Sequence, residues 1–408
     1  MRCRFCHNEL TYVFADLGTA PASNSFVTAK QLHEGEIYYP LKVFVCEHCF
    51  LVQIDEFKKA TDIFSEDYVY FSSVSNSWLE HSKRYVEMMI PRLSLDEKSL
   101  VIEIASNDGY LLQYVREHGI PCMGIEPTAS TARVAREKGI ESLERFFGVE
   151  LAKELAQNGR QADLLLGNNV LAHVPDINDF VAGLKIVLKP GGTITMEFPH
   201  LMRLVEGNQF DTIYHEHFSY LSLCAVSKIF EKQRLTIYDV DELPTHGGSL
   251  RIYAKHTDNT NIPIAENVYK LLDIERDKGM FTLEYYEGFQ AKVNRVKLDF
   301  VDFLITQQRN GKKVAAYGAA AKGNTLLNYC GVKSDWIEFV CDRAESKQGR
   351  FLPGSRVPVV AENVLKERKP DYVVIFPWNI RSEIEQQLEY IRDWGGRFVT
   401  AIPELRVE

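Results

Sequence analysis

Seven consecutive residues concentrate side chains that can move protons. Positions 214–220 read Tyr-His-Glu-His-Phe-Ser-Tyr. Histidine titrates near neutral pH, and a neighbouring carboxylate or phenol can orient it and hold the proton that it accepts. A zinc protease motif needs two histidines four residues apart on a helix, whereas His215 and His217 are two apart. The block therefore favours acid–base chemistry over metal binding; the plainer alternative is a polar loop whose histidines are satisfied internally.

Four cysteines near the start of the chain are spaced as two metal-binding knuckles. Cys3 and Cys6 form one C-x-x-C pair, and Cys46 and Cys49 form a second. Each knuckle points two thiolates at one ion, so two knuckles complete the tetrahedral shell that Zn²⁺ prefers. Because a closed four-sulfur shell leaves no open position for chemistry, we expect a structural zinc ion. A redox pair, which needs only one such motif, and four simple buried thiols are the alternatives.

The stretch 100–112 reads as a strand, a tight turn and a helix start, Leu-Val-Ile-Glu-Ile-Ala-Ser-Asn-Asp-Gly-Tyr-Leu-Leu. It lacks the G-x-G-x-x-G spacing with which a pyrophosphate approaches a helix N-terminus, so a cofactor without phosphates suits it better. Glu126 ends the next apolar run, where a carboxylate can accept hydrogen bonds from both hydroxyls of a ribose. Asn168 and Asn169 end a third run. The pattern predicts a cofactor site at the ends of these strands.

A second strand–loop–helix unit covers 313–325 and carries Lys322 at the expected helix start. Small residues in its loop let backbone N–H groups approach an anion, and the helix dipole together with Lys322 would favour phosphate. Asp342 follows the next strand, at the position of the acidic residue in an NAD site, but the G-x-G-x-x-G spacing is again absent. We favour contact of residues 319–324 with a substrate; NAD binding and a pure scaffold role are the alternatives.

Short apolar runs alternate with helical stretches from residue 100 onward. The sequence predicts a helical connector over 265–308 and strands at 100–105, 122–125, 162–167, 193–198, 313–317, 337–341, 372–376 and 398–401. Such alternation is typical of parallel α/β sheets. We expect an α/β protein with a small zinc-binding N-terminal domain at 1–70, one α/β domain at 71–260 and a second, Rossmann-like α/β domain at 261–408.

The composition supports ordered domains and limits the choice of partners. The chain has 408 residues, 45% of them hydrophobic, which is enough for two or three domains. Its 47 basic and 56 acidic residues give a net charge of −9, which argues against an electrostatic grip on nucleic acid. No apolar run is long enough to span a membrane, and the start has no signal-peptide pattern. We expect a soluble, cytoplasmic protein with four ordinary buried thiols, Cys122, Cys224, Cys330 and Cys341.

Residues 75–255 resemble the class I S-adenosylmethionine (SAM) methyltransferase fold. The resemblance rests on the strand-end Glu126 and on the Leu-Lys-Pro-Gly-Gly turn at 188–192, although Ala-Ser-Asn-Asp-Gly at 105–109 replaces the usual glycine-rich first loop. It implies SAM as the cofactor. The residues that it places around the cofactor are Glu103, Ser106, Asn107, Gly109, Tyr110, Leu111, Glu126, Pro127, Asn168 and Asn169.

Motifs along the whole chain resemble the sugar C-methyltransferases of deoxysugar biosynthesis. They are the two C-x-x-C pairs, the segments 66–73, 103–109 and 214–220, Thr-His-Gly-Gly-Ser-Leu-Arg at 245–251, and Tyr-Gly-Ala-Ala-Ala-Lys-Gly-Asn-Thr at 317–325. That family methylates a ring carbon beside the ketone of a nucleotide-linked 4-keto-6-deoxyhexose, usually C-3 and in some members C-5. The resemblance implies a SAM-dependent C-methyltransferase that acts, through an enolate, on a nucleotide-diphosphate ketodeoxysugar, which we expect to be dTDP-linked.

The resemblance also implies roles for individual residues. The expected catalytic set is His217 as base, Glu216 as its partner, Tyr214 and His173 as hydrogen-bond donors to substrate oxygens, and Tyr68 or Tyr70 reaching in from the zinc-binding side. His215 is a second choice. The expected substrate contacts are His246, Arg251, Lys322 and Asn324. Two other interpretations stay open: an NAD-dependent sugar-nucleotide epimerase or dehydrogenase, and a zinc-knuckle binding module with an inactive methyltransferase fold.

Overall fold

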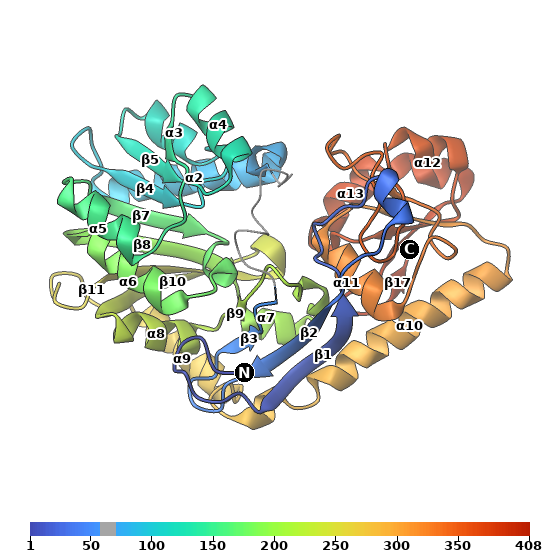
Figure 1. Ribbon diagram of the computed structural model, residues 1–408, viewed down its shortest axis with the longest axis horizontal. Helices are drawn as coiled ribbons and strands as arrows, with labels where there is room; N and C mark the ends of the chain where they lie inside the picture. Colours follow the sequence, from blue (N-terminus) through green and yellow to red (C-terminus); the bar gives the residue numbers. More distant parts are fainter. Residues whose placement is uncertain (58–70) are drawn as a thin grey trace.

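The computed structural model describes residues 1–57 and 71–408, whose strands form three sheets (Figure 1). A seven-stranded sheet with its helices makes the left-hand lobe of Figure 1, and a six-stranded sheet lies in the right-hand lobe. A four-stranded sheet lies between and below them. The α/β prediction is confirmed. Tyr68 and Tyr70 lie outside the described residues.

The small sheet joins the N-terminal segment to a distant part of the chain. It is antiparallel, in the order β1 (Tyr12–Ala20), β2 (Tyr39–Val45), β3 (Val52–Ile54) and β9 (Ser219–Tyr220). In the β3–β9 pair, Val52 lies opposite Tyr220 and Gln53 opposite Ser219. Because β9 directly follows residues 214–218, this pairing holds the Tyr-His-Glu-His block at the seam between the small sheet and the left-hand lobe. The sequence analysis missed β9, since two residues show no alternation.

The seven-stranded sheet has the order β10-β11-β8-β7-β4-β5-β6. Its strands are β4 (Val101–Ile104), β5 (Cys122–Ile125), β6 (Glu141–Leu143), β7 (Ala162–Asn168), β8 (Leu188–Pro199), β10 (Leu235–Leu243) and β11 (Ser249–His256). Its helices are α2 (Asn76–Leu93), α3 (Leu112–Glu117), α4 (Ala129–Glu137), α5 (Val149–Gln157), α6 (Ile177–Val187), α7 (Leu201–Glu206) and α8 (Leu223–Lys232). The strands from β8 to β6 are parallel to one another, and the strand order reverses at β4. Ligands bind outside the carboxyl ends of strands at such a switch point.

The six-stranded sheet has the order β14-β13-β12-β15-β16-β17, with its own switch point beside β12. Its strands are β12 (Val314–Tyr317), β13 (Val340–Cys341), β14 (Val359–Val360), β15 (Tyr372–Ile375), β16 (Arg397–Thr400) and β17 (Arg406–Val407). The helices of this part are α11 (Ala321–Cys330), α12 (Asn363–Arg368) and α13 (Arg381–Gln387). The expected connector is two helices, α9 (Glu266–Asp277) and α10 (Phe289–Arg309). It breaks because Gly279 and Gly288 take left-handed φ values of 88° and 76°.

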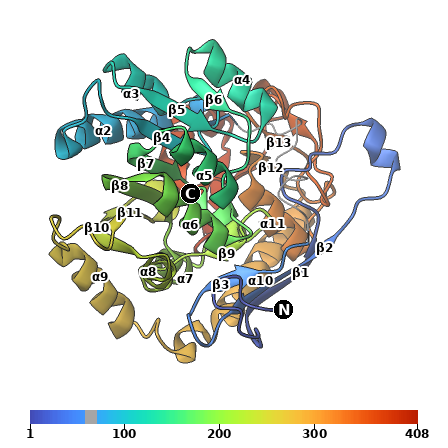
Figure 2. The ribbon, with the colours of Figure 1, turned by 60° about the vertical axis from the view of Figure 1, so that its left-hand side comes forward.

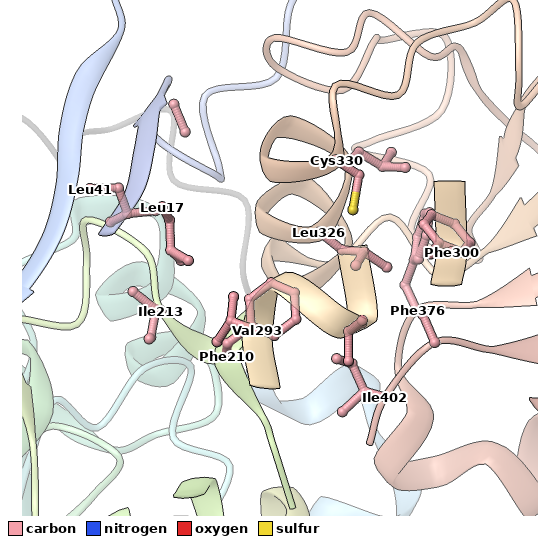
Figure 3. Close-up of a cluster of buried hydrophobic side chains, with 14 of the residues drawn as sticks. Leu17, Leu41, Phe210, Ile213, Val293, Phe300, Leu326, Cys330, Phe376 and Ile402 are labelled. Atoms are coloured by element: carbon pink, nitrogen blue, oxygen red, sulfur yellow. The ribbon is translucent and has the colours of Figure 1, made fainter. Parts of the chain in front are cut away.

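One hydrophobic core runs through the small sheet, α10, α11 and the six-stranded sheet. Figure 3 shows Leu17 and Leu41 from the small sheet on one side of it and Leu326 and Cys330 of α11 on the other. Figure 2 shows β1 and β2 lying beside α10. None of the eight cysteines forms a disulfide; Cys122 is partly exposed because it starts its strand, and the other three outside the quartet are buried as expected. Among the helices of residues 1–57 and 71–408, none is long and apolar enough to cross a membrane.

Candidate active site

A cavity of about 530 Å³ lies where the three parts of the chain meet. Asn24 lines it from the N-terminal segment. The left-hand lobe contributes Trp78, Ala105, Asn107, Tyr110, Glu126, Pro127, Phe147, Asn168, Asn169, His173, Tyr214, Glu216, His217, Tyr220 and His246, and the right-hand lobe contributes Ala320, Ala321, Lys322, Lys347 and Asn379. The structure thus brings most of the predicted site residues together around one space.

The loop after β4 is tight without being rich in glycine. Ala105, Asn107 and Gly109 all take left-handed φ values, of 56°, 48° and 73°. A Cβ on Gly109 would lie 2.5 Å from Ile140 Cδ1, so only glycine fits there. The backbone N–H groups of Asn107 and Thr128 each donate to Glu126 at 2.9 Å. Burial raises the pKa of Glu126, although both donors oppose the shift.

The cavity wall beside this loop fits a nucleoside-like cation. Asn169 Oδ1 is buried and has no hydrogen-bond partner among the described residues, so it can accept from a ligand. Asn168 Nδ2 donates to the Tyr110 hydroxyl at 3.2 Å, and the Trp78 ring stacks on Tyr110 with centroids 6.0 Å apart. An aromatic face is a favourable neighbour for a cationic group. The other predicted cofactor residues lie behind this wall, fully or nearly fully buried: Glu103, Ser106, Gly109 and Leu111.

His217 lines the cavity with both ring nitrogens engaged. Nδ1 lies 2.8 Å from the Thr212 carbonyl oxygen, and Nε2 lies 2.8 Å from the Tyr214 hydroxyl. A carbonyl oxygen only accepts, so Nδ1 carries the proton and Nε2 accepts from Tyr214. Burial, followed by the neighbouring His173, lowers the pKa of His217 well below its usual value. The ring is therefore a neutral imidazole near pH 7, the form that can take up a proton.

The other members of the block take different places. Both carboxylate oxygens of Glu216 accept from Asn24 Nδ2 at 2.8 Å, which ties the block to the N-terminal segment. The His173 ring stands edge-on to His217 with centroids 4.7 Å apart, and burial lowers its pKa to about 4. His215 is buried and holds the Pro40 carbonyl at 3.2 Å, a structural contact to β2. The two ring nitrogens of His217 are thus held by Thr212 and Tyr214. Glu216, which we had expected to be the partner of His217, binds Asn24.

The 245–251 segment is organised around Glu197, a buried carboxylate that the sequence analysis did not single out. Glu197 accepts from Thr245 Oγ1 at 2.9 Å, from Arg251 at 2.8 Å and pairs with His81 at 2.9 Å. Burial alone would raise the pKa of Glu197, but His81 and Arg251 hold it at about 2. Arg251 therefore lies in this internal ion pair rather than at the cavity. His246 lies between Thr245 and Arg251, the two residues that bind Glu197; it takes a φ of 55° and lines the cavity.

The right-hand wall presents a lysine at the start of α11. Lys322 Nζ donates to Asn379 Oδ1 at 2.8 Å and lies 4.3 Å from the centroid of the Trp378 ring. Burial lowers the pKa of Lys322 to about 8, and Asp211 opposes that shift. Lys347 lines the same wall and was missed, because only the fold brings it there. Asn324 is fully buried and donates to the Ser23 carbonyl at 2.6 Å, so it joins two domains behind the wall.

The loop after β12 uses its small residues for internal packing. At Gly318, where φ is 87°, a Cβ would lie 2.4 Å from Pro377 Cγ. Asp342 accepts from the N–H groups of Ala319 and Ala344, each at 2.8 Å, and Lys347 lies 3.4 Å away. A dinucleotide would need to come close to the backbone at Gly318, and Pro377 already fills that space.

The four N-terminal cysteines form a ready tetrahedral set. Their Sγ atoms all lie within 4.8 Å of one another, and the closest contacts are 3.4–3.7 Å. Four sulfurs at about 2.3 Å from zinc would lie ~3.8 Å apart. The residues after the knuckles, His7 and Phe50, take matching φ values of 64° and 62°. Because His7 and His48 are exposed, neither replaces a cysteine, and the residues fit a structural zinc ion.

Comparison with known proteins shows which domains the chain contains. Family models match residues 3–64 as a zinc-binding domain, 78–240 as a methyltransferase domain and 244–403 as the C-terminal domain of C-methyltransferases. The C-methyltransferase NovU of Streptomyces niveus is 33% identical over 406 residues, covering 99% of this chain and 96% of NovU. A ubiquinone biosynthesis O-methyltransferase of Chelativorans is 31% identical over 93 residues, 22% of this chain and 37% of its own.

Among solved structures, a SAM-dependent methyltransferase from Clostridium acetobutylicum covers 43% of this chain and 91% of its own, with 12% identity and a TM-score of 0.36. The full-length relative and the three successive domain matches carry the assignment. SAM is the cofactor, and the four cysteines form the zinc site. The chain belongs to the family of SAM-dependent C-methyltransferases with an N-terminal zinc-binding domain.

Proposed function

We propose that the methyl acceptor is a ring carbon, C-3, beside the ketone of a dTDP-linked 4-keto-6-deoxysugar. One observation carries the proposal. The neutral His217–Tyr214 pair lines the same cavity as the loop after β4, where we expect SAM, and as Lys322. A base that shares a cavity with a methyl donor and a cationic side chain suits a substrate that has an acidic C–H bond and a negative charge. The whole-chain resemblance to sugar C-methyltransferases supplies the substrate class.

The chemistry follows from how this chain arranges its protons. A C–H bond next to a ketone becomes nucleophilic only after the carbon loses its proton and the electron pair moves into an enolate. His217 takes that proton at Nε2, while Nδ1 keeps its hydrogen bond to Thr212. The Tyr214 hydroxyl, displaced from Nε2, donates instead to the oxygen on which negative charge develops. When bound, SAM supplies an electrophilic sulfonium methyl group.

Low local polarity makes this pairing of charges effective. The pKa of His217 is lowered because it is buried and has His173 beside it, so an isolated imidazolium is disfavoured there. An enolate formed next to the imidazolium is its counter-charge, and proton transfer then creates a pair of opposite charges in a site with little water. The base is weak without the substrate and becomes stronger with it.

The enolate step can be tested apart from methyl transfer. In D₂O without SAM, the enzyme should exchange the C-3 hydrogen of a dTDP-4-keto-6-deoxysugar, as measured by mass spectrometry. With methyl-labelled SAM, the label should appear on the same carbon. Exchange or methylation at C-5 would correct the position, and absence of both with every ketodeoxysugar in a panel would contradict the substrate class.

Lys322 should bind the diphosphate of the substrate. We expect Lys322→Ala to raise the KM for the sugar nucleotide about 10- to 100-fold, the value of one or two charge-assisted hydrogen bonds, with kcat and the KM for SAM little changed. Lys322→Arg keeps the charge and Lys333→Ala, on the exposed surface, is the matched control. Because lysine is cationic below its pKa of about 8, kcat/KM for the sugar nucleotide should fall as pH rises through that value. An unchanged KM in Lys322→Ala would favour the scaffold role.

Glu126 should hold the ribose of SAM. Glu126→Gln puts an amide group where two backbone N–H donors now meet a carboxylate, and it weakens acceptance from ribose hydroxyls. We expect the Kd for SAM, measured by calorimetry, to rise about 10- to 100-fold. Glu137→Gln, an exposed change on α4, should leave it within about 2-fold. Unchanged SAM affinity in Glu126→Gln would remove Glu126 from the ribose site.

A further inference from the structure

The proton on His217 depends on one backbone carbonyl. Thr212 ends η4, the short 3-10 turn Phe210–Thr212, and its carbonyl oxygen is the acceptor 2.8 Å from His217 Nδ1. If that oxygen moved away, the proton could shift to Nε2, which faces Tyr214 and the cavity. The ring would then present a donor where the reaction needs an acceptor. The position of η4 therefore decides whether His217 can act as a base.

Hydrogen bonds from the right-hand lobe hold this turn on both sides of Thr212. The residue before it, Asp211, accepts from the indole Nε1 of Trp378 at 2.7 Å. The residue after it, Ile213, has its carbonyl oxygen held by Thr325 Oγ1 of α11 at 2.8 Å. Asp211 and Thr325 are each only 2% exposed, so water does not compete for these bonds. Both donors come from residues more than a hundred positions further along the chain.

Apolar packing also holds η4 in place. Phe210 and Ile213 are completely buried in the core that also contains Val293 of α10 and Leu326 of α11. Figure 3 shows the side chains of Phe210 and Ile213 on the α10 and α11 side of the small-sheet strands. The two residues that flank the 211–212 peptide are thus fixed to helices of the right-hand lobe. The turn cannot shift by an ångström without disturbing a packed core.

We propose that the C-terminal domain sets the tautomer and position of His217 through η4, with Trp378 and Thr325 as positioning residues. Neither residue is assigned contact with the reacting atoms; each fixes one neighbour of the Thr212 carbonyl. The catalytic meaning of this arrangement rests on the proposed role of His217 as base. The arrangement also gives the C-terminal domain a task in the proton-transfer step, separate from substrate binding by Lys322.

Two substitutions remove the donors and leave most of the packing. Trp378→Phe keeps an aromatic ring near Lys322, whose Nζ lies 4.3 Å from the indole centroid, but loses the N–H donor. Thr325→Val replaces the hydroxyl by a methyl group of similar size. We expect each to lower kcat by about 3- to 10-fold and the double variant by about 10- to 100-fold, as for loss of one and two hydrogen bonds. Both KM values should stay within about 2-fold.

The direct readout is the tautomer. In the zinc-loaded full chain labelled with ¹⁵N-histidine, the His217 signals, assigned with His217→Asn, should show Nδ1 protonated and Nε2 unprotonated. The double variant should shift both signals toward a mixture of tautomers. Thr325→Ser, which restores the hydroxyl, should recover the wild-type signals and kcat. Two matched controls each lose a remote donor: Trp394→Phe, whose indole donates to the Pro370 carbonyl, and Thr236→Val, whose hydroxyl pairs with Thr257.

The outcomes separate this inference from the proposed function. Unchanged ¹⁵N signals in the double variant would overturn the positioning role. Altered signals together with a His217→Asn enzyme of normal turnover would uphold the positioning role and reject His217 as base. If the double variant is unstable by circular dichroism, the comparison of Thr325→Val with Thr325→Ser decides alone: identical signals in those two variants would overturn the role of the hydroxyl.

Discussion

Replacing His217 with asparagine is expected to lower kcat at least ~100-fold, the scale of a lost general base. Asparagine is close in size and can still donate to the Thr212 carbonyl, so the loop should keep its shape. It has no basic nitrogen, so the substrate proton has no acceptor in place of Nε2. The affinity for SAM should stay within about 2-fold, because His217 is not among the residues that we expect at the cofactor.

A second measurement and a control variant test this prediction. Hydrogen exchange at the substrate carbon in D₂O should disappear along with turnover, since both need the same proton transfer. His118→Asn, an exposed histidine on the surface, is the matched control and should behave as wild type. Near-normal turnover of His217→Asn would show that another group takes the proton.

The pH dependence of kcat/KM on the acid side follows from the same residue. A base works only in its deprotonated form, and burial lowers the pKa of His217 well below its usual value. The neutral form therefore persists to lower pH than for a free histidine. We expect kcat/KM for the sugar nucleotide, which reports the free enzyme, to stay level from about pH 7 down past pH 6.5, the ordinary histidine pKa, before it falls. A fall centred at pH 6.5 or above would contradict a buried, neutral resting state.

Replacing the zinc ligand Cys46 with serine is expected to lower both the activity and the stability strongly. Serine does not replace a thiolate in a zinc–sulfur shell, and the binding energy of a structural zinc ion is part of the folding energy of its domain. The ion joins the knuckle before β1 to the knuckle after β2. Its loss should loosen β3, which pairs with β9 directly after the Tyr-His-Glu-His block. We expect kcat/KM to fall at least ~100-fold, with a lower melting temperature.

The zinc prediction is checked by metal analysis. The wild-type chain should hold one zinc ion and Cys46→Ser none, and a strong chelator should reproduce the effect of the mutation. Cys122→Ser changes a cysteine outside the quartet and is the matched control. A Cys46→Ser protein that keeps both its zinc and its activity would show that three cysteines and another ligand suffice.

Local patterns in the sequence were enough for the cysteine quartet, for the eight strands that were predicted and for the place of Glu126 at the cavity. Two C-x-x-C knuckles carry their own geometry, because each places two thiolates within one turn. Apolar runs such as 314–317 and 373–375 are buried strands because their residues are hydrophobic throughout. Glu126 follows from its place at a strand end, where parallel sheets bind ligands. All of these depend on short-range spacing.

Other residues could not be placed from spacing. Arg251 was expected at the substrate, yet it forms a buried pair with Glu197, which lies opposite it on the neighbouring antiparallel strand. Asn324 was expected at the substrate with Lys322, yet two residues along α11 amount to a rotation of about 200°, which turns it into the domain interface, where it binds the Ser23 carbonyl. A charge or an amide in a sequence shows what it can bind. Which partner it finds depends on strand register and helix phase across the whole fold.

The sequence by itself indicated the cofactor class, the cysteine quartet and the Tyr-His-Glu-His block, because residue types and short spacings carry that chemistry. It predicted Glu216 as the partner of His217, and the structure places Tyr214 there. Only the tertiary structure decided how the pair is held. The two-residue strand β9 pins it to the zinc-binding sheet, and Trp378 and Thr325 fix the turn that holds its proton. These contacts join residues that are at least 112 positions apart in the chain. Packing of the shared core brings them together. No local pattern records such contacts.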